Sequence, residues 1–491
     1  MKRYTFLLIL SLIAGTSYSQ SVDNALKYSR QEFSGTARST AMGGAFGALG
    51  GDFSSLSINP GGIGVYRSSE FTFTPSIEYT ESKNSGFSED KYSFTMGNVG
   101  YVATFIPRMA PEKGWQNFNF GIGYNRIANF NREGYLFNLN SGTSLLDRWA
   151  SLASGESDEL YPFEEKLAYD TYLININDEG NYQAVLFEGD RMDQQKRIDE
   201  KGYIGEYVLS FGANYGHKLY LGATVGIQDL YHKSTTSYSE FSLMDNITSL
   251  NEFTFNEYMT TSGVGVNLKF GAIYKVTNSL RLGAAIHTPT FYNLEEKYYT
   301  SLSSTFEPSI PDGFPEDGEA THSYYSADIN NKDLTAIANY DFETPFRTIL
   351  SAAYLFGKKA ILSVDYEMID YSNTEFNDSD VSDSMEDNQK IADTYQSTSN
   401  LRIGAEYRIT PNFSLRGGYA KIGDPYKSAV NEGYDTYSGG FGIKQNNFFF
   451  DMAYQYKEYN EDFVMYDGSV DDFVRLNNTN HQVRMTFGFK F

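Results

Sequence analysis

The chain has 491 residues, among them 40 Tyr, 37 Phe and 44 Gly but no Cys, and its formal net charge is -23. The acidic balance excludes nucleic-acid binding, which needs basic patches, and the negative mean hydropathy of -0.44 excludes a helical membrane protein. The high aromatic content is typical of transmembrane β-barrels, which place aromatic side chains at both membrane interfaces while every second residue faces a polar lumen.

The N-terminus has the pattern of a secretory signal peptide. Lys2 and Arg3 precede the apolar run 6–14, and small residues follow up to Ser19. The run is too short to span a bilayer. We therefore predict a signal peptide over 1–19, export of the chain, and membrane crossing by strands.

Residues 20–68 are rich in glycine and small side chains and do not alternate, which predicts a plug, or hatch, that fills a barrel lumen. Within it, Pro60 holds Asn59 extended. The Asn59 amide can then bond exposed backbone, while Gly61 and Gly62 allow a sharp turn against the wall.

The segment TARSTAMGGAFGALGGD (36–52) and the following Asn59-Pro60 resemble the FadL/TodX family of outer-membrane transporters, in which the motif usually reads Asn-Pro-Ala; here Gly61 takes the third place. The resemblance implies a fourteen-stranded barrel with an N-terminal hatch. It also implies passive passage of long-chain fatty acids or aromatic hydrocarbons, without an energy-coupling partner.

From Phe71 onward, alternating segments are joined in turn by tight turns and long loops, which predicts an all-β antiparallel barrel over 69–491. Such a barrel lies in the bacterial outer membrane with lipid around it, short turns and both termini on the periplasmic side. The predicted strands, about fourteen in number, are 69–80, 93–106, 117–130, 203–216, 218–234, 252–276, 279–300, 333–356, 358–374, 396–409, 412–424, 434–445, 448–460 and 480–491.

The alternation also assigns the two faces of each strand. Val364 and Ile403 fall on the lipid-facing phase, where a charge is expected to be costly. Ser363 and Gly404 fall on the lumen-facing phase, where a charge is expected to be tolerated better.

The long predicted loop 131–202 contains a helical apolar spacing at Leu145, Leu146, Trp149 and Leu152. This short helix could form a surface groove for an apolar ligand or could pack down as a lid on the barrel mouth. The acidic loop 375–395 could bridge divalent cations, although a solvated loop is the favoured interpretation.

Four arginines fall on the lumen-facing phase of their strands: Arg347, Arg402, Arg416 and Arg484. They could hold a ligand carboxylate. The favoured interpretation is that they pair with the lumen acids Asp365, Glu367, Glu406 and Asp451.

Glycines on the second and third strands, namely Gly97, Gly100, Gly121 and Gly123, could weaken the ladder there and allow a sideways exit for ligands. Close packing beside aromatic side chains is the favoured alternative.

The five histidines show no metal-ligand spacing, and only His287 is a conceivable catalytic base. We therefore predict no enzyme activity, cofactor or metal. The sequence favours a passive channel for hydrophobic small molecules or lipids. The alternative is a structural or accessory barrel in a larger complex, with outer-membrane protein partners.

Overall fold

The computed structural model describes residues 19–491 except 33–34, 85, 108–113, 155–159, 245, 247, 308–319, 326–334, 378–380, 429–431 and 467–472. The predicted signal peptide, 1–19, lies outside the described residues except for Ser19.

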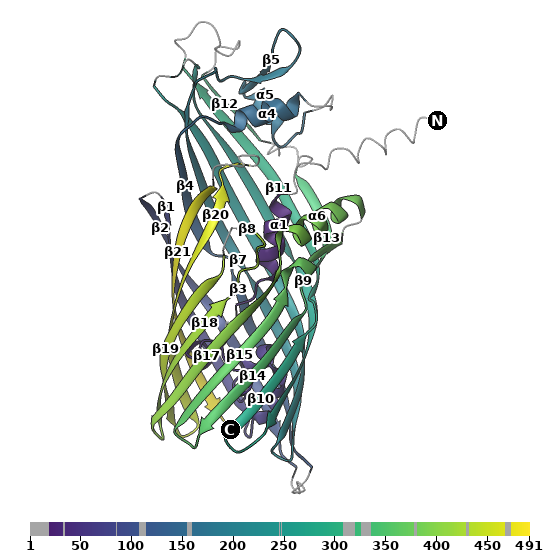
Figure 1. Cartoon of the computed structure of the whole chain (residues 1–491), viewed down its shortest axis with the longest axis vertical. Helices are drawn as coiled ribbons and strands as arrows, with labels where there is room; N and C mark the ends of the chain where they lie inside the picture. The colour runs from purple at the N-terminus through teal and green to yellow at the C-terminus, as the bar shows by residue number, and fades with distance from the viewer. Residues whose placement is uncertain are drawn as a thin grey trace, which may run out of the picture.

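One antiparallel sheet forms a closed barrel, because the first strand pairs with both the second and the last (Figure 1). Its 19 segments occupy fourteen positions around the wall, since several strands are interrupted along their length. The segments are β1 (Glu70–Asn84), β2 (Phe87–Phe105), β3 (Trp115–Asn129), β4 (Arg132–Ser141), β7 (Met192–Tyr215), β8 (Leu219–Ser242), β9 (Leu250–Lys275), β10 (Leu280–His287), β11 (Phe291–Phe306), β12 (Thr321–Tyr325), β13 (Ala336–Glu343), β14 (Arg347–Phe356), β15 (Ala360–Asp370), β16 (Glu375–Asn377), β17 (Ser397–Thr410), β18 (Phe413–Ile422), β19 (Tyr434–Gln445), β20 (Phe448–Val464) and β21 (Phe473–Lys490). The predicted fold class is confirmed.

Two of the predicted strands are broken by prolines. Pro289 separates β10 from β11, and Pro345 separates β13 from β14. Proline has no amide hydrogen to donate to a ladder, so regular pairing stops on either side of it. The two interruptions lie side by side, where the Thr290 amide donates to the Thr344 hydroxyl at 2.8 Å.

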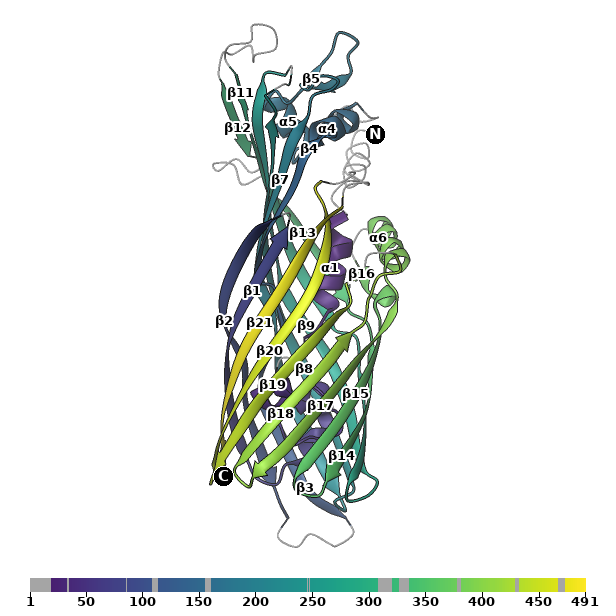
Figure 2. The ribbon, with the colours of Figure 1, turned by 60° about the vertical axis from the view of Figure 1, so that its left-hand side comes forward.

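The predicted loop 131–202 is largely ordered, which corrects the expectation of one long connection. It contains β4, α4 (Leu145–Ala153), α5 (Glu165–Asp170) and a small hairpin of β5 (Ile174–Ile176) and β6 (Tyr182–Ala184), and β7 already begins at Met192. Strands β7, β8 and β9 are 24, 24 and 26 residues long. A membrane crossing needs only about 9–11 residues, so these strands continue beyond the bilayer as an extension that carries α4 and α5 (Figures 1 and 2).

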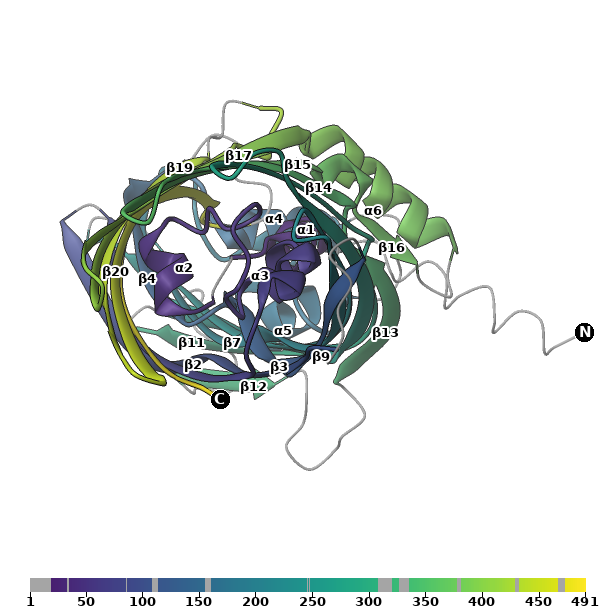
Figure 3. The same ribbon diagram turned by 90° about the horizontal axis from the view of Figure 1, so that it is seen from below.

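The N-terminal segment lies inside the barrel. It comprises α1 (Ser19–Ser29), α2 (Ala37–Ala41), α3 (Ser55–Ile58) and the 3-10 helix η1 (Pro60–Val65), which the strands surround when viewed from below (Figure 3). As predicted, β1 starts and β21 ends at the end that carries the short turns. The helix α1, however, lies high in the lumen, toward the long loops (Figure 2), so the N-terminal segment does not start at the periplasmic end.

The lumen is filled at Ser363 and Gly404, so a larger side chain there would also meet packed groups. Ser363 is completely buried. A Cβ atom on Gly404 would stand 2.4 Å from the Met42 carbonyl oxygen of the hatch. Both faces of the wall are therefore constrained, one by lipid and the other by the hatch. Within the described part of the chain, no helix is long and apolar enough to cross a membrane.

The lipid-facing phase leads to a first prediction. Val364→Arg should lower the free energy of unfolding by about 2–4 kcal/mol, because a guanidinium near the bilayer midplane loses its hydration. Urea titration in liposomes, followed by heat-modifiable mobility in gels, measures this change. The control is Thr410→Arg at the exposed turn end, for which we expect a cost of about 0–1 kcal/mol; equal costs at the two positions would contradict the assignment of the faces.

Candidate functional site

Asn59 is the polar centre of the hatch and is completely buried. Its amide nitrogen donates to the Gly47 carbonyl oxygen at 2.6 Å and to the Ala272 carbonyl oxygen of β9 at 3.2 Å. Its side-chain oxygen accepts from the Gly61 amide at 3.0 Å. The side chain thus joins two turns of the hatch to the wall, and Pro60, Gly61 and Gly62 follow it as the buried start of η1.

Wall glycines make this close approach possible. A Cβ atom on Gly271 would stand 2.0 Å from Asn59 Oδ1, and one on Gly222 would stand 2.0 Å from the Pro60 carbonyl oxygen. Any side chain at these positions of β8 and β9 would push the hatch away from the wall. Sequence analysis did not single out these two residues, because only the folded barrel brings them opposite Asn59 and Pro60.

The glycines predicted to weaken the second and third strands also receive the hatch. Cβ atoms on Gly100 and Gly123 would lie within 2.5 Å of the Phe53 ring, and one on Gly121 would lie 2.6 Å from Leu56. These contacts agree with the favoured alternative, in which the glycines allow close packing rather than weaken the ladder. Gly97, in contrast, lies next to the point where the ladder ends, because β2 and β3 pair only from Asn98 opposite Asn125 down to Phe105 opposite Phe118.

The predicted lumen arginines are engaged by protein groups. Arg347 and Arg402 form ion pairs with Glu367 at 3.2 and 2.6 Å, and Arg347 also donates to the Ser29 carbonyl oxygen. Arg416 pairs with Glu406 at 2.8 Å and with Asp451 at 2.6 Å.

Arg484, the fourth of these arginines, donates to the Thr40 hydroxyl of the hatch at 3.0 Å. Three of the four arginines therefore bind the acids named by the favoured interpretation, and two of the four bond directly to the N-terminal segment.

A cavity of 780 Å³ surrounds α1 in the upper lumen, between the hatch and the helix α4. Its wall includes thirteen aromatic residues, namely Phe130, Trp149, Tyr238, Phe255, Tyr298, Tyr340, Tyr371, Phe376, Tyr426, Tyr434, Tyr459, Phe463 and Tyr466. A cavity of this size with many aromatic and a number of polar wall residues is typical of a small-molecule site. No composition or spacing of the sequence predicted it, because its walls come from segments distributed over most of the chain.

The charged residues of this cavity are mostly acidic. Six bases line it, and four of them pair with acids of the same wall: Lys27 with Glu200, Arg30 with Glu432, Arg132 with Glu200 and Glu461, and Lys457 with Glu32. Ten acids line it, namely Asp23, Glu32, Glu164, Glu200, Glu257, Glu296, Asp387, Glu432, Glu461 and Asp462.

The predicted helix over 144–152 is present as α4, but it does not form an open surface groove. Leu145, Leu146 and Trp149 are buried among other apolar side chains, and only Leu152 is exposed. Leu145 and Trp149 face the cavity, so α4 lies over it in the position of a lid. Trp149 donates its indole N–H to Glu164 at 3.1 Å and contacts the Phe255 ring.

His287 and the described part of the acidic segment 375–395 also have defined places in the structure. His287 faces the hatch, with its Nε2 3.0 Å from the Ile58 carbonyl oxygen. The described residues contain no group of three potential metal ligands. The acidic segment 375–395 forms β16 and the helix α6 (Val381–Thr394) on the described residues, and its Asp378 and Asp380 lie outside them.

The closed barrel, the filled lumen and the cavity above it define an outer-membrane β-barrel with an N-terminal plug. The family model described as "Outer membrane protein transport protein (OMPP1/FadL/TodX)" matches residues 208–432. This match lies outside the N-terminal segment, so the resemblance to the FadL/TodX family and the outer-membrane location are confirmed by a second part of the chain.

Solved structures show the same fold. A FadL homologue of Pseudomonas aeruginosa is 14% identical, with a TM-score of 0.55, over 93% of this chain and 98% of that one. The P. putida toluene transporter TodX is 14% identical, with a TM-score of 0.51, over 94% and 99%. The CymD monoaromatic hydrocarbon channel is 12% identical, with a TM-score of 0.51, over 93% and 97%. No curated protein matches the sequence.

Loss of the Asn59 amide should release the hatch from the wall. Asn59→Ala leaves several buried backbone groups without a partner, and each such group costs about 1–3 kcal/mol. We expect the amides over 47–61 to exchange with deuterium at least about tenfold faster, as measured by mass spectrometry, because of this lost stabilisation. Asn412→Ala, in an exposed turn, is the control, and unchanged exchange in Asn59→Ala would contradict the anchoring role.

The Trp149–Glu164 contact should make the lid sensitive to pH. Burial, with the neighbouring charges of Glu165 and Glu257, raises the pKa of the Glu164 carboxyl to about 8. Because the folded pKa lies above the unfolded value of about 4.3, the lid is stable at acid pH and loses stability as the pH rises through about 8. We expect Trp149 fluorescence, in a Trp115→Phe background, to report a looser lid at alkaline pH.

Glu164→Gln is the control for this titration, since the amide keeps the acceptor for the indole and cannot ionise. Its fluorescence should not change over the same range. A lid that loosens on acidification instead would contradict the prediction.

Proposed function

We propose that this protein carries uncharged hydrophobic small molecules passively from the cell surface into the outer membrane. The observation that carries the proposal is the position of the 780 Å³ cavity. It lies above a lumen filled by the hatch, and its wall includes Ala128, Asn129, Phe130 and Arg132, at the junction of β3 and β4.

The barrel wall beside this junction supports a sideways exit. Strand β2 extends up to Phe87, yet its ladder with β3 stops at Asn98, and β4 pairs with β7. A hydrophobic ligand in the cavity therefore has the hatch below it. Beside it lies a section of wall in which the described residues of β2 and β4 form no ladder with each other. Apolar molecules gain free energy on leaving for lipid, so no energy source is needed. These observations do not favour the alternative of an accessory barrel.

The charges of the cavity support uncharged ligands over fatty-acid anions. A carboxylate would enter a cavity with ten acids and six bases, of which four bases are already paired with acids of the wall. Of the acids, Glu164 is uncharged at neutral pH because its pKa is about 8, and the others leave an excess of negative charge. Like charges in a site of low polarity repel strongly. Aromatic side chains make dispersion contacts with rings and alkyl chains, and these contacts do not require a charged ligand.

A matched pair of ligands tests the proposal. Dodecanol and dodecanoate share an alkyl chain and differ in the head group, and their uptake can be followed with radiolabel in liposomes that contain lipopolysaccharide. At neutral pH we expect the protein to accelerate dodecanol uptake, and to accelerate dodecanoate uptake at least about tenfold less because of the charge repulsion. Acidification, which protonates dodecanoate, should reduce the difference.

No acceleration of either compound above empty liposomes would overturn the transport role. Faster uptake of dodecanoate than of dodecanol would retain transport and overturn the preference for uncharged ligands. A large ion conductance of the intact protein in planar bilayers would contradict the hatch as a plug.

A further inference from the structure

The upper half of β2 is an edge without a backbone partner inside an otherwise closed wall. Over Phe87–Gly97 it pairs with β1 on one side. On its other side, within the described residues, no strand is hydrogen-bonded to this stretch, since β3 pairs with β2 only below it and β4 pairs with β7. We call this vertical boundary between β2 and the β4–β7 pair the seam.

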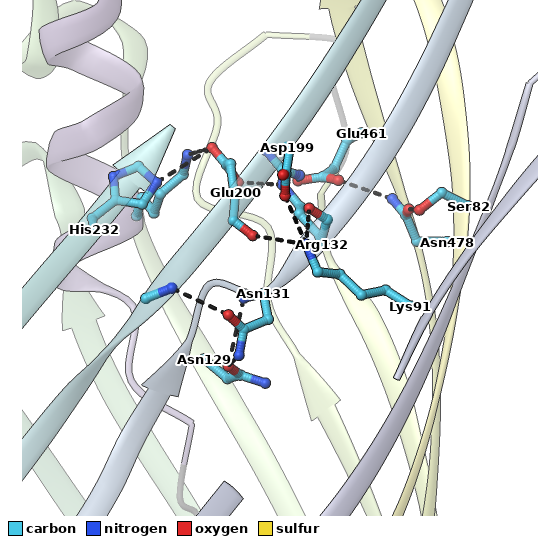
Figure 4. Close-up of polar contacts among 12 residues, drawn as sticks. Ser82, Lys91, Asn129, Asn131, Arg132, Asp199, Glu200, His232, Glu461 and Asn478 are labelled. Atoms are coloured by element: carbon cyan, nitrogen blue, oxygen red, sulfur yellow. Dashed lines mark hydrogen bonds and ion pairs between the residues drawn. The ribbon is translucent and has the colours of Figure 1, made fainter. Parts of the chain in front are cut away.

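A single lysine crosses the seam. Lys91 of β2 places its Nζ 2.7 Å from Asp199 Oδ1 of β7 and 3.1 Å from Glu133 Oε1 of β4. The same Nζ donates to the carbonyl oxygens of Arg132 and Glu200 at 3.4 Å. Figure 4 shows Lys91 reaching from its strand toward Arg132 and Asp199. The three hydrogens of the ammonium group are thus directed at oxygens of both opposite strands.

The groups beside Lys91 connect the seam to the cavity. Glu200 faces the cavity and accepts from Lys27 of α1 at 2.5 Å and from Arg132. Arg132 in turn binds Glu461 of β20. A ligand that shifts α1 would therefore disturb the carboxylate next to Asp199, which is the first partner of Lys91.

A side-chain bond differs physically from the ladder that it replaces. Backbone hydrogen bonds of a barrel form a cooperative series, whereas one ammonium group can swing away by rotation about its own side-chain bonds. The Lys91 side chain is 13% exposed, Asp199 28% and Glu133 25%, so salt can screen the attraction. The seam can thus open without loss of any strand pairing.

We propose that Lys91 is the residue that holds the lateral exit closed, as a latch between β2 and the β4–β7 pair. This inference rests on the proposed function, since it names the control of the same exit. Release of Lys91 from Asp199 and Glu133 separates the seam and lets a hydrophobic ligand pass from the cavity into the outer leaflet.

The test measures the arrival of 1-pyrenemethanol, an uncharged hydrophobic fluorophore, at a lipid-linked quencher in liposomes that contain the full-length protein. We expect Lys91→Met to speed arrival about tenfold, since loss of a charge-assisted bond changes a rate by about that factor. Raised salt should speed the wild type and leave Lys91→Met unchanged. Lys91→Arg should restore a slow, salt-dependent rate.

The matched control is Lys201→Met. Lys201 also binds Asp199, through Oδ2 at 3.0 Å, but the two residues belong to the same strand, so this bond does not cross the seam. We expect its rate to stay close to that of the wild type. Equal acceleration by Lys201→Met and Lys91→Met would overturn the latch and assign the effect to the charge of Asp199.

A second construction keeps the proposal testable if Lys91→Met does not fold. Phe87 and Phe137 stack across the seam with ring centroids 4.1 Å apart, and the chain contains no cysteine of its own. In Phe87→Cys/Phe137→Cys, oxidation should stop arrival and reduction should restore it. Equal rates in both states, or a wild-type rate in folded Lys91→Met, would overturn the latch. Failure of the wild type to accelerate arrival would overturn the proposed function itself.

Discussion

The structure depends on one constraint, which is that a strand in lipid must find partners for all its backbone hydrogen-bonding groups. The pairing of β1 with β21 meets this constraint by closing the sheet. The seam departs from it, because within the described part of the chain the upper part of β2 has a backbone partner on one side only. There, side chains such as Lys91 hold β2 to β4 and β7 in place of backbone hydrogen bonds. This weaker section of wall lies beside the cavity.

The same need for partners governs the lumen. Unpaired charges are costly in a filled barrel interior, so three of the four lumen arginines pair with acids of neighbouring strands, and Arg484 donates to the Thr40 hydroxyl of the hatch. Arg38 of the hatch binds Glu406 at 2.9 Å, and the Ser57 hydroxyl donates to Glu206 at 2.6 Å. Wall glycines such as Gly222 and Gly271 then allow the hatch backbone to approach closely. Polar bonds and missing side chains together fix the hatch in one position.

The extension beyond the membrane-spanning wall has a different role from the wall itself. Strands β7, β8 and β9 continue upward and support α4, which places Trp149 over the cavity. The lid and α1 enclose a space whose charged groups are mostly acids. In the proposed function, the hatch blocks the way down and the seam at the side of the cavity is the exit for an apolar ligand.

The pattern of residues along the chain is enough to predict the barrel and the hatch. Period-two alternation, as in Val483, Met485 and Phe487, can only be segregated by a strand, and the small residues of 20–68 suit only a densely packed filling. Outside the membrane, lipid does not impose an alternation of apolar and polar residues on a strand. The sequence pattern therefore predicts a loop where β4 and the start of β7 form strands.

The cavity, the partners of the lumen arginines and the seam become visible only in the folded chain. These features join residues more than a hundred positions apart in the sequence, such as Arg30 with Glu432 and Lys91 with Asp199. Which charges meet depends on the register of strands and on the path of the hatch, and one residue of slip would turn every side chain to the other face. Sequence periodicity defines the two faces of each strand, but the distance between two strands across the lumen is fixed only when the barrel closes.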